Sequence, residues 1–325
     1  MTGKPRVALI GATGIGKHHG KWYAMEGCAV VAFAGSSPDS VARTRDAMAQ
    51  LFGFQGRGYT DVHDMLSEQK PNAVSVCSPH HLHRAHTLAC FEAGAHVLCE
   101  KPLVWDATKA AQDLLADAAS MISAAAQARL MLAVNTQYVA AIVPYLALYQ
   151  EHRGALGAIE RLDFRMESKG GVSGPNQYDE IWIDLASHPL SLMLRLLPGA
   201  VFVADSARCV IRRDEVTAQF EMEQPNGKRC SVKIELRNIY EGLMARRFGA
   251  NGFMADLTGG NDDRGIYRTY ISAEGDRVAC EDLVHSSVRR FADAVRGTGD
   301  PLATGAEALT NLEVQLALFA AARRE

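Results

Sequence analysis

The chain lacks a long apolar segment, a closely spaced cysteine pair and an excess of charge of one sign. No stretch of its 325 residues is apolar for long enough to span a bilayer, and the early apolar run Ala8–Ile10 leads straight into a glycine-rich turn, unlike a signal peptide. The seven cysteines form no close pair of the kind that indicates a disulfide framework. These absences predict a cytoplasmic protein in a reducing compartment, with no membrane partner.

Charge and composition indicate an ordinary globular protein and argue against nucleic-acid binding. The 34 basic and 37 acidic residues leave a formal net charge of −3, which is too balanced for attraction to nucleic acid to dominate the surface. Hydrophobic residues make up 48% of the chain and charged residues 22%, as in ordinary globular proteins. Because 325 residues exceed the size at which one core normally keeps growing, we expect two domains.

The hydrophobic pattern changes along the chain. Residues 6 to about 135 alternate short apolar runs with helical patterns, which is typical of a parallel sheet wound by helices. The five strands expected there are Arg6–Ile10, Ala29–Ala34, Ala73–Cys77, His96–Cys99 and Met131–Asn135. Later segments alternate with period two, most clearly over 230–238, which predicts long antiparallel strands with one buried face. We therefore predict an α/β protein with an N-terminal Rossmann domain over 1–127. We also predict a C-terminal α+β domain over 128–325, built on an open, mainly antiparallel sheet.

A glycine-rich turn, Gly11-Ala12-Thr13-Gly14-Ile15-Gly16, follows the first expected strand and opens the first expected helix. Backbone amides at such a helix start bind a pyrophosphate. Thr13 stands where the GxGxxG pattern keeps a bare glycine, so Gly14 is expected to allow the close approach instead. A plain tight turn is the alternative. The residues expected to bind the cofactor here are Gly11, Thr13, Gly14, Ile15 and Gly16.

The end of the second expected strand bears on the choice of dinucleotide. It lacks the acidic residue that would accept both ribose hydroxyls of NAD. Ser36 and Ser37 stand there instead, with Arg43 and Arg45 following, and this combination suits a 2′-phosphate. The sequence therefore favours NADP(H) over NAD(H). The alternative is that the serines only cap the next helix.

A tripeptide, Glu100-Lys101-Pro102, follows the apolar run 96–99, so Lys101 is expected at the carboxyl edge of a parallel strand, where open α/β sheets bind ligands. The stretch from Ser78-Pro79-His80 through His83 to this tripeptide closely resembles the glucose-fructose oxidoreductase, inositol dehydrogenase and rhizopine-catabolism (Gfo/Idh/MocA) family.

A second match lies far along the chain. Members of that family carry an aspartate and a histidine four residues apart on a helix, and Asp184 and His188 have this spacing, which places both on one helical face. Two positions depart from the family pattern, because Ala186 replaces a common glycine and Ser191 replaces an aspartate. The alternative is a salt-bridged pair on a solvated helix face.

The resemblance implies a NAD(P)-dependent dehydrogenase or reductase that acts on CH–OH groups of a sugar, cyclitol or related polyol. Lys101 would polarise the reacting oxygen, His188 would move the proton, and Asp184 would orient the pair in a crevice between the two domains. The physics agrees, since histidine titrates near the working pH and lysine supplies positive charge where alkoxide character develops.

The resemblance also implies further binding residues. Ser78, Pro79 and His80 would lie along the nicotinamide ribose, and Glu100 would face the cofactor. His83 belongs to the same expected cofactor set, although buttressing of the following helix is its more ordinary role. The expected substrate-binding residues are Lys101, Gln137, Tyr178, Trp182, Asp184 and His188. Gln137 replaces a common arginine, and the two aromatics have core packing as their alternative.

Other functions stay open at this point. No metal site is expected, because the histidines at 80, 81, 83 and 86 lack carboxylates or thiolates at ligand spacing. A non-catalytic NAD(P)-binding regulator and an imine or opine-type reductase are the competing functions. The resemblance implies a homodimer or homotetramer, with the C-terminal domain over 128–325 binding substrate and mediating oligomerisation. Neither the substrate itself nor the reaction direction follows from the sequence.

Overall fold

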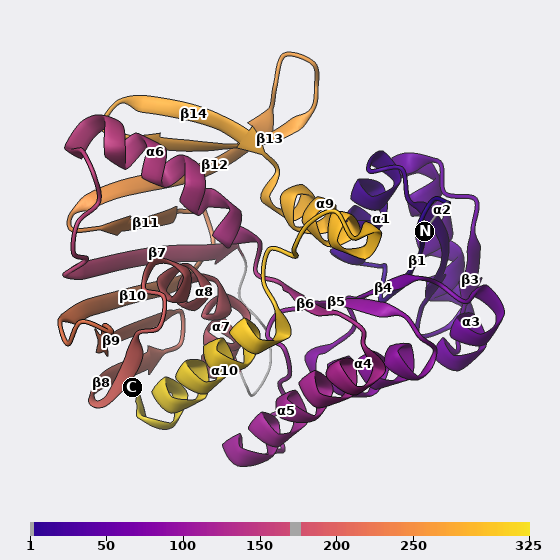
Figure 1. The fold of residues 1–325 in the computed structure, drawn as a ribbon, viewed down its shortest axis with the longest axis horizontal. Helices are drawn as coiled ribbons and strands as arrows, with labels where there is room; N and C mark the ends of the chain where they lie inside the picture. Colours follow the sequence, from indigo (N-terminus) through magenta and orange to yellow (C-terminus); the bar gives the residue numbers. More distant parts are fainter. Residues whose placement is uncertain (1–2, 170–176) are drawn as a thin grey trace. The chain divides into compact units, whose positions relative to one another are not determined.

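The structure is a computed structural model in which residues 3–169 and 177–325 are described. The chain forms two compact units (Figure 1). The first comprises Met1–Gln137 and Val284–Leu309, and the second comprises Tyr138–Leu283 and Thr310–Glu325. Residues 128–137 and 284–309 thus pack with the first unit, where we had expected the boundary after residue 127.

The first unit is built on a six-stranded parallel sheet with strand order β3-β2-β1-β4-β5-β6, which confirms the predicted Rossmann-type fold. Its strands are β1 (Arg6–Ile10), β2 (Ala29–Ala34), β3 (Arg57–Tyr59), β4 (Ala73–Val76), β5 (His96–Glu100) and β6 (Leu132–Asn135). β3 was not predicted, because three residues carry no apolar run. The strand order reverses between β1 and β4, and such a switch point is where open sheets bind ligands.

Helices cover both faces of this sheet, as expected of a doubly wound fold. They are α1 (Gly16–Met25), α2 (Pro38–Phe52), α3 (Val62–Gln69), α4 (His83–Glu92), α5 (Ala111–Ala128) and α9 (Leu283–Arg296), with a 3-10 turn, η1, over His80–Leu82. Val288 and Phe291 of α9 are fully buried in the same core as Phe33 and Met48. Burial of each such side chain stabilises the fold by about 1.5–3 kcal/mol, which explains why this late segment belongs to the first unit.

The second unit is built on a nine-stranded sheet, with strand order β14-β13-β12-β11-β7-β10-β9-β8-β15. Its strands are β7 (Arg161–Lys169), β8 (Val201–Arg212), β9 (Glu215–Glu223), β10 (Arg229–Ile239), β11 (Arg246–Ala250), β12 (Phe253–Asn261), β13 (Tyr267–Ala273), β14 (Asp276–Glu281) and β15 (Ala322–Arg324). Most neighbours are antiparallel, as predicted, but β7 with β10 and β8 with β15 are parallel. In β10, Val232 and Ile234 are buried while Lys233 and Glu235 stay partly exposed, so one face packs and the other is polar.

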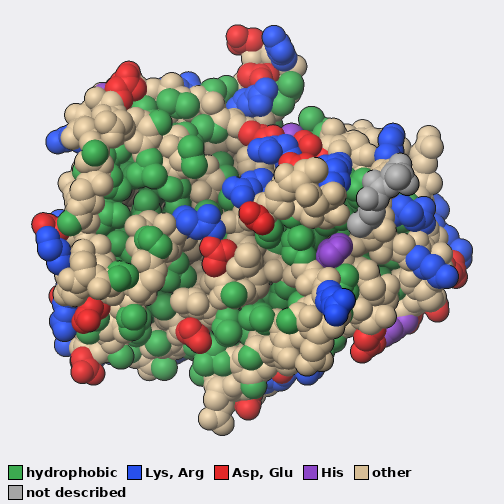
Figure 2. Space-filling view, viewed as in Figure 1, with side chains coloured by type: hydrophobic (Ala, Val, Ile, Leu, Met, Phe, Trp, Pro, Cys, Tyr) green, Lys and Arg blue, Asp and Glu red, His purple; other side chains and the backbone are tan. Residues whose placement is uncertain are grey.

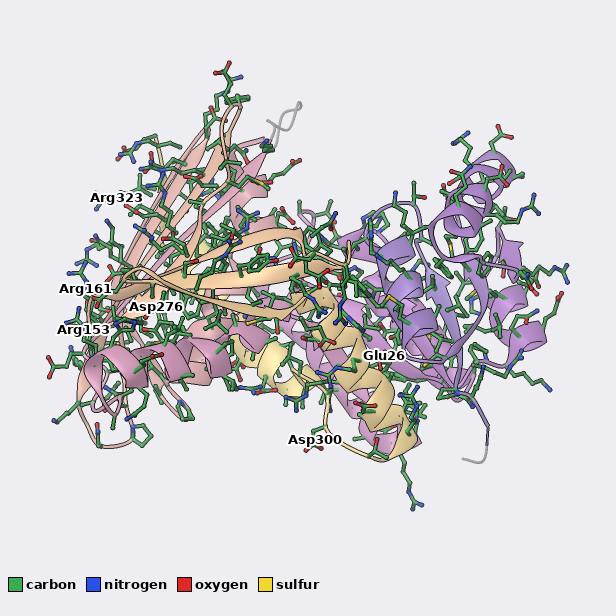
Figure 3. All side chains as sticks on the ribbon, turned by 90° about the horizontal axis from the view of Figure 1, so that it is seen from above. Glu26, Arg153, Arg161, Asp276, Asp300 and Arg323 are labelled. Carbon is green, nitrogen blue, oxygen red and sulfur yellow. The ribbon has the colours of Figure 1, made fainter. Side chains whose placement is uncertain are left out.

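The remaining helices are α6 (Ile142–Arg153), α7 (Gln177–Leu185), α8 (Ser187–Leu196) and α10 (Gly305–Ala320), with a 3-10 turn over Gln137–Ala141. Nε2 of His152 in α6 lies 2.8 Å from Asp276 Oδ2, and Arg153 of the same helix pairs with Glu274, so α6 contacts the turn after β13 and the start of β14 (Figure 3). Of the helices in the described ranges, none is both long and apolar enough to cross a membrane. Basic and acidic side chains are interspersed on the face shown in Figure 2, in line with the balanced charge.

Candidate functional site

The glycine-rich turn lies between β1 and α1, at the switch point of the first sheet. Gly11 has φ 85°, and a Cβ at this position would come within 2.5 Å of the Cys77 carbonyl oxygen. A Cβ on Gly16 would come equally close to the Gly11 carbonyl oxygen. These two glycines are therefore required by the packing of the turn itself.

Gly14 is different, because no residue that the structure describes requires a glycine there. A Cβ on Gly14 would meet no described atom within 4 Å, and its φ is not positive. The hydroxyl of the preceding Thr13 lies 3.4 Å from the Thr44 hydroxyl of α2. No described side chain caps α1, so its first amide groups are available to an anion. The turn thus has the open space and the donors that a dinucleotide pyrophosphate needs.

The two serines after β2 have different environments. Ser37 is the N-cap of α2, because its hydroxyl oxygen accepts a hydrogen bond from the Ser40 amide at 3.2 Å. For Ser37 the capping alternative is therefore what the structure shows. Ser36, Arg43 and Arg45 are exposed.

The loop after β4 holds Ser78, Pro79 and His80. Pro79 is exposed and His80 is half-buried, while the Ser78 hydroxyl is 2.9 Å from His86 Nδ1. His83 does not face a ligand, because it is completely buried between two carbonyl oxygens, that of Ser78 at 2.9 Å and that of Pro102 at 3.0 Å. The expected cofactor contact of His83 is corrected accordingly: its ring braces two loops. Burial lowers the pKa of both His83 and His86.

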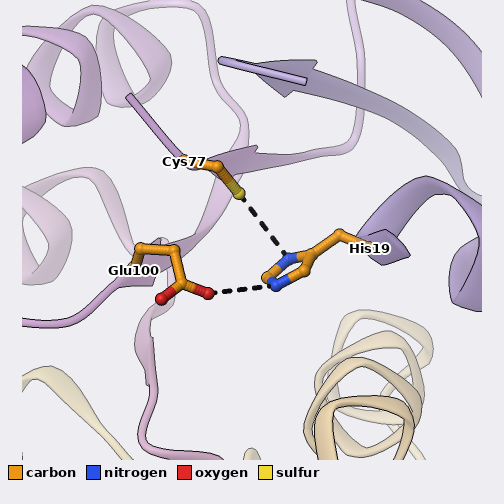
Figure 4. A group of neighbouring side chains, drawn as sticks. All are labelled: His19, Cys77 and Glu100. Carbon is orange, nitrogen blue, oxygen red and sulfur yellow. Dashed lines mark hydrogen bonds and ion pairs between the residues drawn. The ribbon is translucent and has the colours of Figure 1, made fainter. Parts of the chain in front are cut away.

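A buried polar cluster lies beneath this edge of the sheet (Figure 4). His19 of α1 is completely buried, with Nε2 3.1 Å from Glu100 Oε1 and Nδ1 3.8 Å from Cys77 Sγ. Asn135, opposite Glu100 in β6, donates from Nδ2 to the same carboxylate oxygen at 2.5 Å. The Glu100 carboxylate is thus directed at these two side chains inside the first unit.

Glu100 is ionised in this cluster. Burial raises the pKa of its carboxyl group, but the hydrogen bond and charge of His19, together with the hydrogen bond of Asn135 and the charge of Lys101, bring the pKa below its ordinary value. The ammonium of Lys101 acts in the same direction. Glu100 therefore keeps a negative charge at the position next to Lys101 in the chain.

Sequence reasoning missed His19 and Cys77 as members of this cluster. A signal was present for His19, which lies three residues after Gly16 and hence on the same buried face of α1. The cluster has metal-ligating side chains, but Cys77 and Glu100 lie beside different nitrogens of the His19 ring, whereas an ion binds one nitrogen. Burial and the charge of Glu100 also raise the pKa of Cys77 well above its usual value, which keeps the thiol protonated. The geometry favours hydrogen bonding over metal binding.

Three consecutive residues at the end of β6 carry buried oxygens with no hydrogen-bond partner among the described residues. These atoms are Asn135 Oδ1, Thr136 Oγ1 and Gln137 Oε1. An unpaired buried acceptor costs about 1–3 kcal/mol, so a ligand that offers N–H or O–H groups would be stabilised here. Lys101 follows β5 directly, is half-buried, and is joined to Pro102 by a cis peptide bond.

Asp184 and His188 belong to the second unit. We expected them on one helix, but α7 ends at Leu185 and α8 begins at Ser187. The interruption is confined to Ala186, whose amide still bonds to the Trp182 carbonyl oxygen at 3.0 Å, so the helical spacing is kept. Asp184 is exposed, whereas His188 is 5% exposed and its ring lies 4.7 Å from that of Tyr138, edge to face.

The two aromatic residues ahead of Asp184 were expected at the substrate entrance. Trp182 is completely buried, and its indole N–H donates to the Gln315 carbonyl oxygen at 3.2 Å, so it is a core residue, as the alternative held. Gln315 returns a bond from Nε2 to the Trp182 carbonyl oxygen. The side chain of Tyr178 lies outside the described part of the chain.

Comparisons with known proteins agree with this geometry. Residues 5–136 match the model of an oxidoreductase family with an NAD-binding Rossmann fold. D-glucoside 3-dehydrogenase of Escherichia coli (strain K12) is 41% identical over 105 residues, which span 31% of this chain and only 28% of that protein. An uncharacterized oxidoreductase of Rhizobium meliloti, ORF334, is 26% identical over 85% of this chain and 84% of its own length.

A solved structure shares the whole fold. The 3-ketoreductase of Actinomadura kijaniata, in complex with NADP and TDP-benzene, superposes with a TM-score of 0.73 over 99% of both chains. The sequence identity is 20%, so this likeness speaks for the fold. Both units of the chain therefore have counterparts in that structure.

Proposed function

We propose that this chain, whose residues 5–136 match the model of the Gfo/Idh/MocA oxidoreductase family, is a NAD(P)-dependent enzyme that transfers a hydride between nicotinamide and a sugar, cyclitol or related polyol. One observation carries the proposal: the glycine-rich turn after β1, which leaves open space at Gly14, and Lys101 after β5 both follow the carboxyl ends of strands in the same parallel sheet. The name of the Escherichia coli relative, a glucoside 3-dehydrogenase, supports the substrate class.

The first unit offers the groups that hold a dinucleotide. The amides of the turn from Gly11 to Gly16 would bind the pyrophosphate, and the buried acceptors at Asn135 and Thr136 suit ligand N–H or O–H groups. When bound, the nicotinamide supplies or accepts the hydride. The protein's own contribution is to bind, orient and polarise.

Lys101 is the residue of the first unit to which we assign a catalytic role. Oxidation of an alcohol removes a hydride from carbon and a proton from oxygen, so negative charge develops on that oxygen. The Lys101 ammonium would stabilise this charge and, in the reverse direction, polarise the carbonyl. We assign the proton transfer to His188. Asp184 would orient the His188 ring, and Gln137 would bind substrate hydroxyl groups.

For the cofactor, we favour NADP(H). Support comes from Ser36 and Arg43, which are both exposed after β2, and from the absence of an acidic residue in the described loop from 35 to 37. Ser37 no longer counts toward this preference, because its hydroxyl caps α2.

We also propose a homodimer or homotetramer that associates through the polar face of the second sheet. Alternating charges there, such as Lys233 with Glu235 at 2.8 Å and Arg165 with Glu167 at 2.6 Å, would suit a polar interface with a second copy. Light scattering at working concentration tests this proposal, and a monomeric mass would count against it.

A direct experiment tests the activity. Fluorescence titration with NADH and NADPH is followed by a polyol and ketose panel with wild type and Lys101→Ala. We expect kcat to fall by at least about 10²-fold in the variant, with dinucleotide affinity within a few-fold of wild type. A wild type that binds dinucleotide but turns over no compound would favour the regulator, and a fully active variant would refute the role of Lys101.

A further inference from the structure

One buried side chain joins the loop after β4 to the loop after β5. His83 is completely buried, and both of its ring nitrogens face backbone carbonyl oxygens. Nε2 lies 2.9 Å from the Ser78 oxygen, and Nδ1 lies 3.0 Å from the Pro102 oxygen. The first carbonyl belongs to the expected nicotinamide loop, and the second belongs to the residue that follows Lys101.

The protonation state of His83 decides how many of these bonds form. A carbonyl oxygen only accepts hydrogen bonds, and a neutral imidazole has a single N–H. Neutral His83 therefore donates to one carbonyl and presents a lone pair to the other. The imidazolium form has two N–H groups and donates to both, so it holds both loops at once.

The surroundings of His83 shift its pKa in opposite directions. Burial lowers its pKa most strongly, while the backbone contacts with Ser78, Pro102 and Leu103 and the negative charge of Glu100 on β5 raise it, and the net pKa lies below the ordinary value. The other titratable groups nearby are His80 of η1, whose ring lies 5.5 Å away, His86 of α4, and Lys101 in the loop that His83 holds. Near neutral pH the ring therefore favours the neutral form, and acid completes the second bond.

We propose that His83 is a positioning residue for Lys101, which ties the Lys101 loop to the Ser78 loop through one hydrogen bond when neutral and through two when protonated. The link to catalysis rests on the proposed function, because it requires Lys101 to act on the substrate. The bonding pattern does not depend on that function.

The bonding pattern can be tested on the wild-type protein. ¹⁵N-histidine NMR of the full chain, with His83 assigned through its contacts in α4, follows both ring nitrogens from about pH 8 to about pH 5. We expect one protonated nitrogen near neutral pH and two at the acid end. A ring that stays in a single neutral tautomer over the whole range would overturn the proposal, whatever the enzyme assay shows.

The effect on catalysis needs a matched pair of variants. His83→Gln removes the bridge, whereas His86→Gln removes a bond to the Ser78 hydroxyl at 2.9 Å and leaves the Pro102 carbonyl untouched. We expect kcat to fall at least about tenfold in His83→Gln, with a dinucleotide Kd within about threefold of wild type. The plot of kcat against pH should also lose the inflection that protonation of His83 causes on its acid side. His86→Gln should keep the wild-type kcat profile.

Two results would remove the catalytic half of the proposal: an unchanged kcat profile in His83→Gln, or equal effects in both variants. If His83→Gln does not fold, the NMR titration of the wild type still decides the question. A wild type that turns over no polyol would count against the proposed function and leave the NMR result standing, so the two failures are distinguishable.

Discussion

Asn135 donates a hydrogen bond to Glu100 across neighbouring strands, with 2.5 Å between Nδ2 and Oε1. His19 approaches the same oxygen from α1. Two donors thus stabilise the ionised form of a carboxylate that is almost fully buried behind Lys101. This arrangement ties the stability of the first unit to the charge next to its proposed catalytic lysine.

Removal of the Glu100 charge should therefore affect stability and catalysis together. Glu100→Gln keeps the shape of the side chain but loses the charge-assisted bond, so we expect the free energy of unfolding to fall by about 1–3 kcal/mol and kcat to decrease. Urea denaturation and steady-state kinetics measure the two effects. Glu92→Gln, at an exposed position of α4, is the control and should change neither. A Glu100→Gln protein as stable as wild type would show that the cluster contributes little.

Two substitutions in the glycine-rich turn should affect protein stability and dinucleotide binding differently. Gly14→Ala places a methyl group in space free of described atoms, so the unfolding temperature of the ligand-free protein should stay close to wild type, while dinucleotide affinity falls at least about tenfold. Gly11→Ala meets a carbonyl oxygen at 2.5 Å with φ 85°, so we expect a loss of more than about 2 kcal/mol. Thermal unfolding without ligand and fluorescence titration measure the two effects. Unchanged affinity in Gly14→Ala would place the pyrophosphate elsewhere.

Cofactor preference should depend on the exposed loop after β2. Arg43→Ala should raise the Kd for NADPH about tenfold and leave the Kd for NADH nearly unchanged, because only NADPH carries the 2′-phosphate. Ser36→Asp should shift the preference toward NADH, since a carboxylate repels that phosphate and accepts bonds from ribose hydroxyls. Parallel titrations with both dinucleotides measure this. Equal changes for the two cofactors in Arg43→Ala would argue against NADP(H).

Stability should decrease in mildly acidic solution. Burial lowers the pKa of His83, His86 and His96 below the ordinary value of about 6.5, so the unfolded chain binds more protons than the native protein below that pH. The free energy of unfolding should therefore be fully retained above about pH 6.5 and fall as the pH decreases toward the folded pKa values. Urea unfolding at several pH values measures this slope. His83→Gln should make the free energy of unfolding depend less steeply on pH. A free energy of unfolding that rises as the pH decreases would contradict the lowered histidine pKa values.

Local sequence patterns determined much of this protein. Five of the six strands of the first sheet, the glycine-rich turn and the place of Lys101 at a strand end follow from apolar runs, turn residues and their order, because these features depend on neighbouring residues. The alternation in β10 likewise predicted a sheet with one buried face. The chemistry expected at Lys101 came from the resemblance of the surrounding motif.

Only the tertiary structure decided which polar side chains meet. His19 and Asn135 are 116 positions apart and come together through the order of strands in the sheet, which no local pattern encodes. Burial changed His83 from an expected cofactor contact into a bridge between two carbonyls, and Trp182 into a core residue. Long-range packing decides whether a polar group meets water, a ligand or another residue, and that environment sets its hydrogen bonds and its charge.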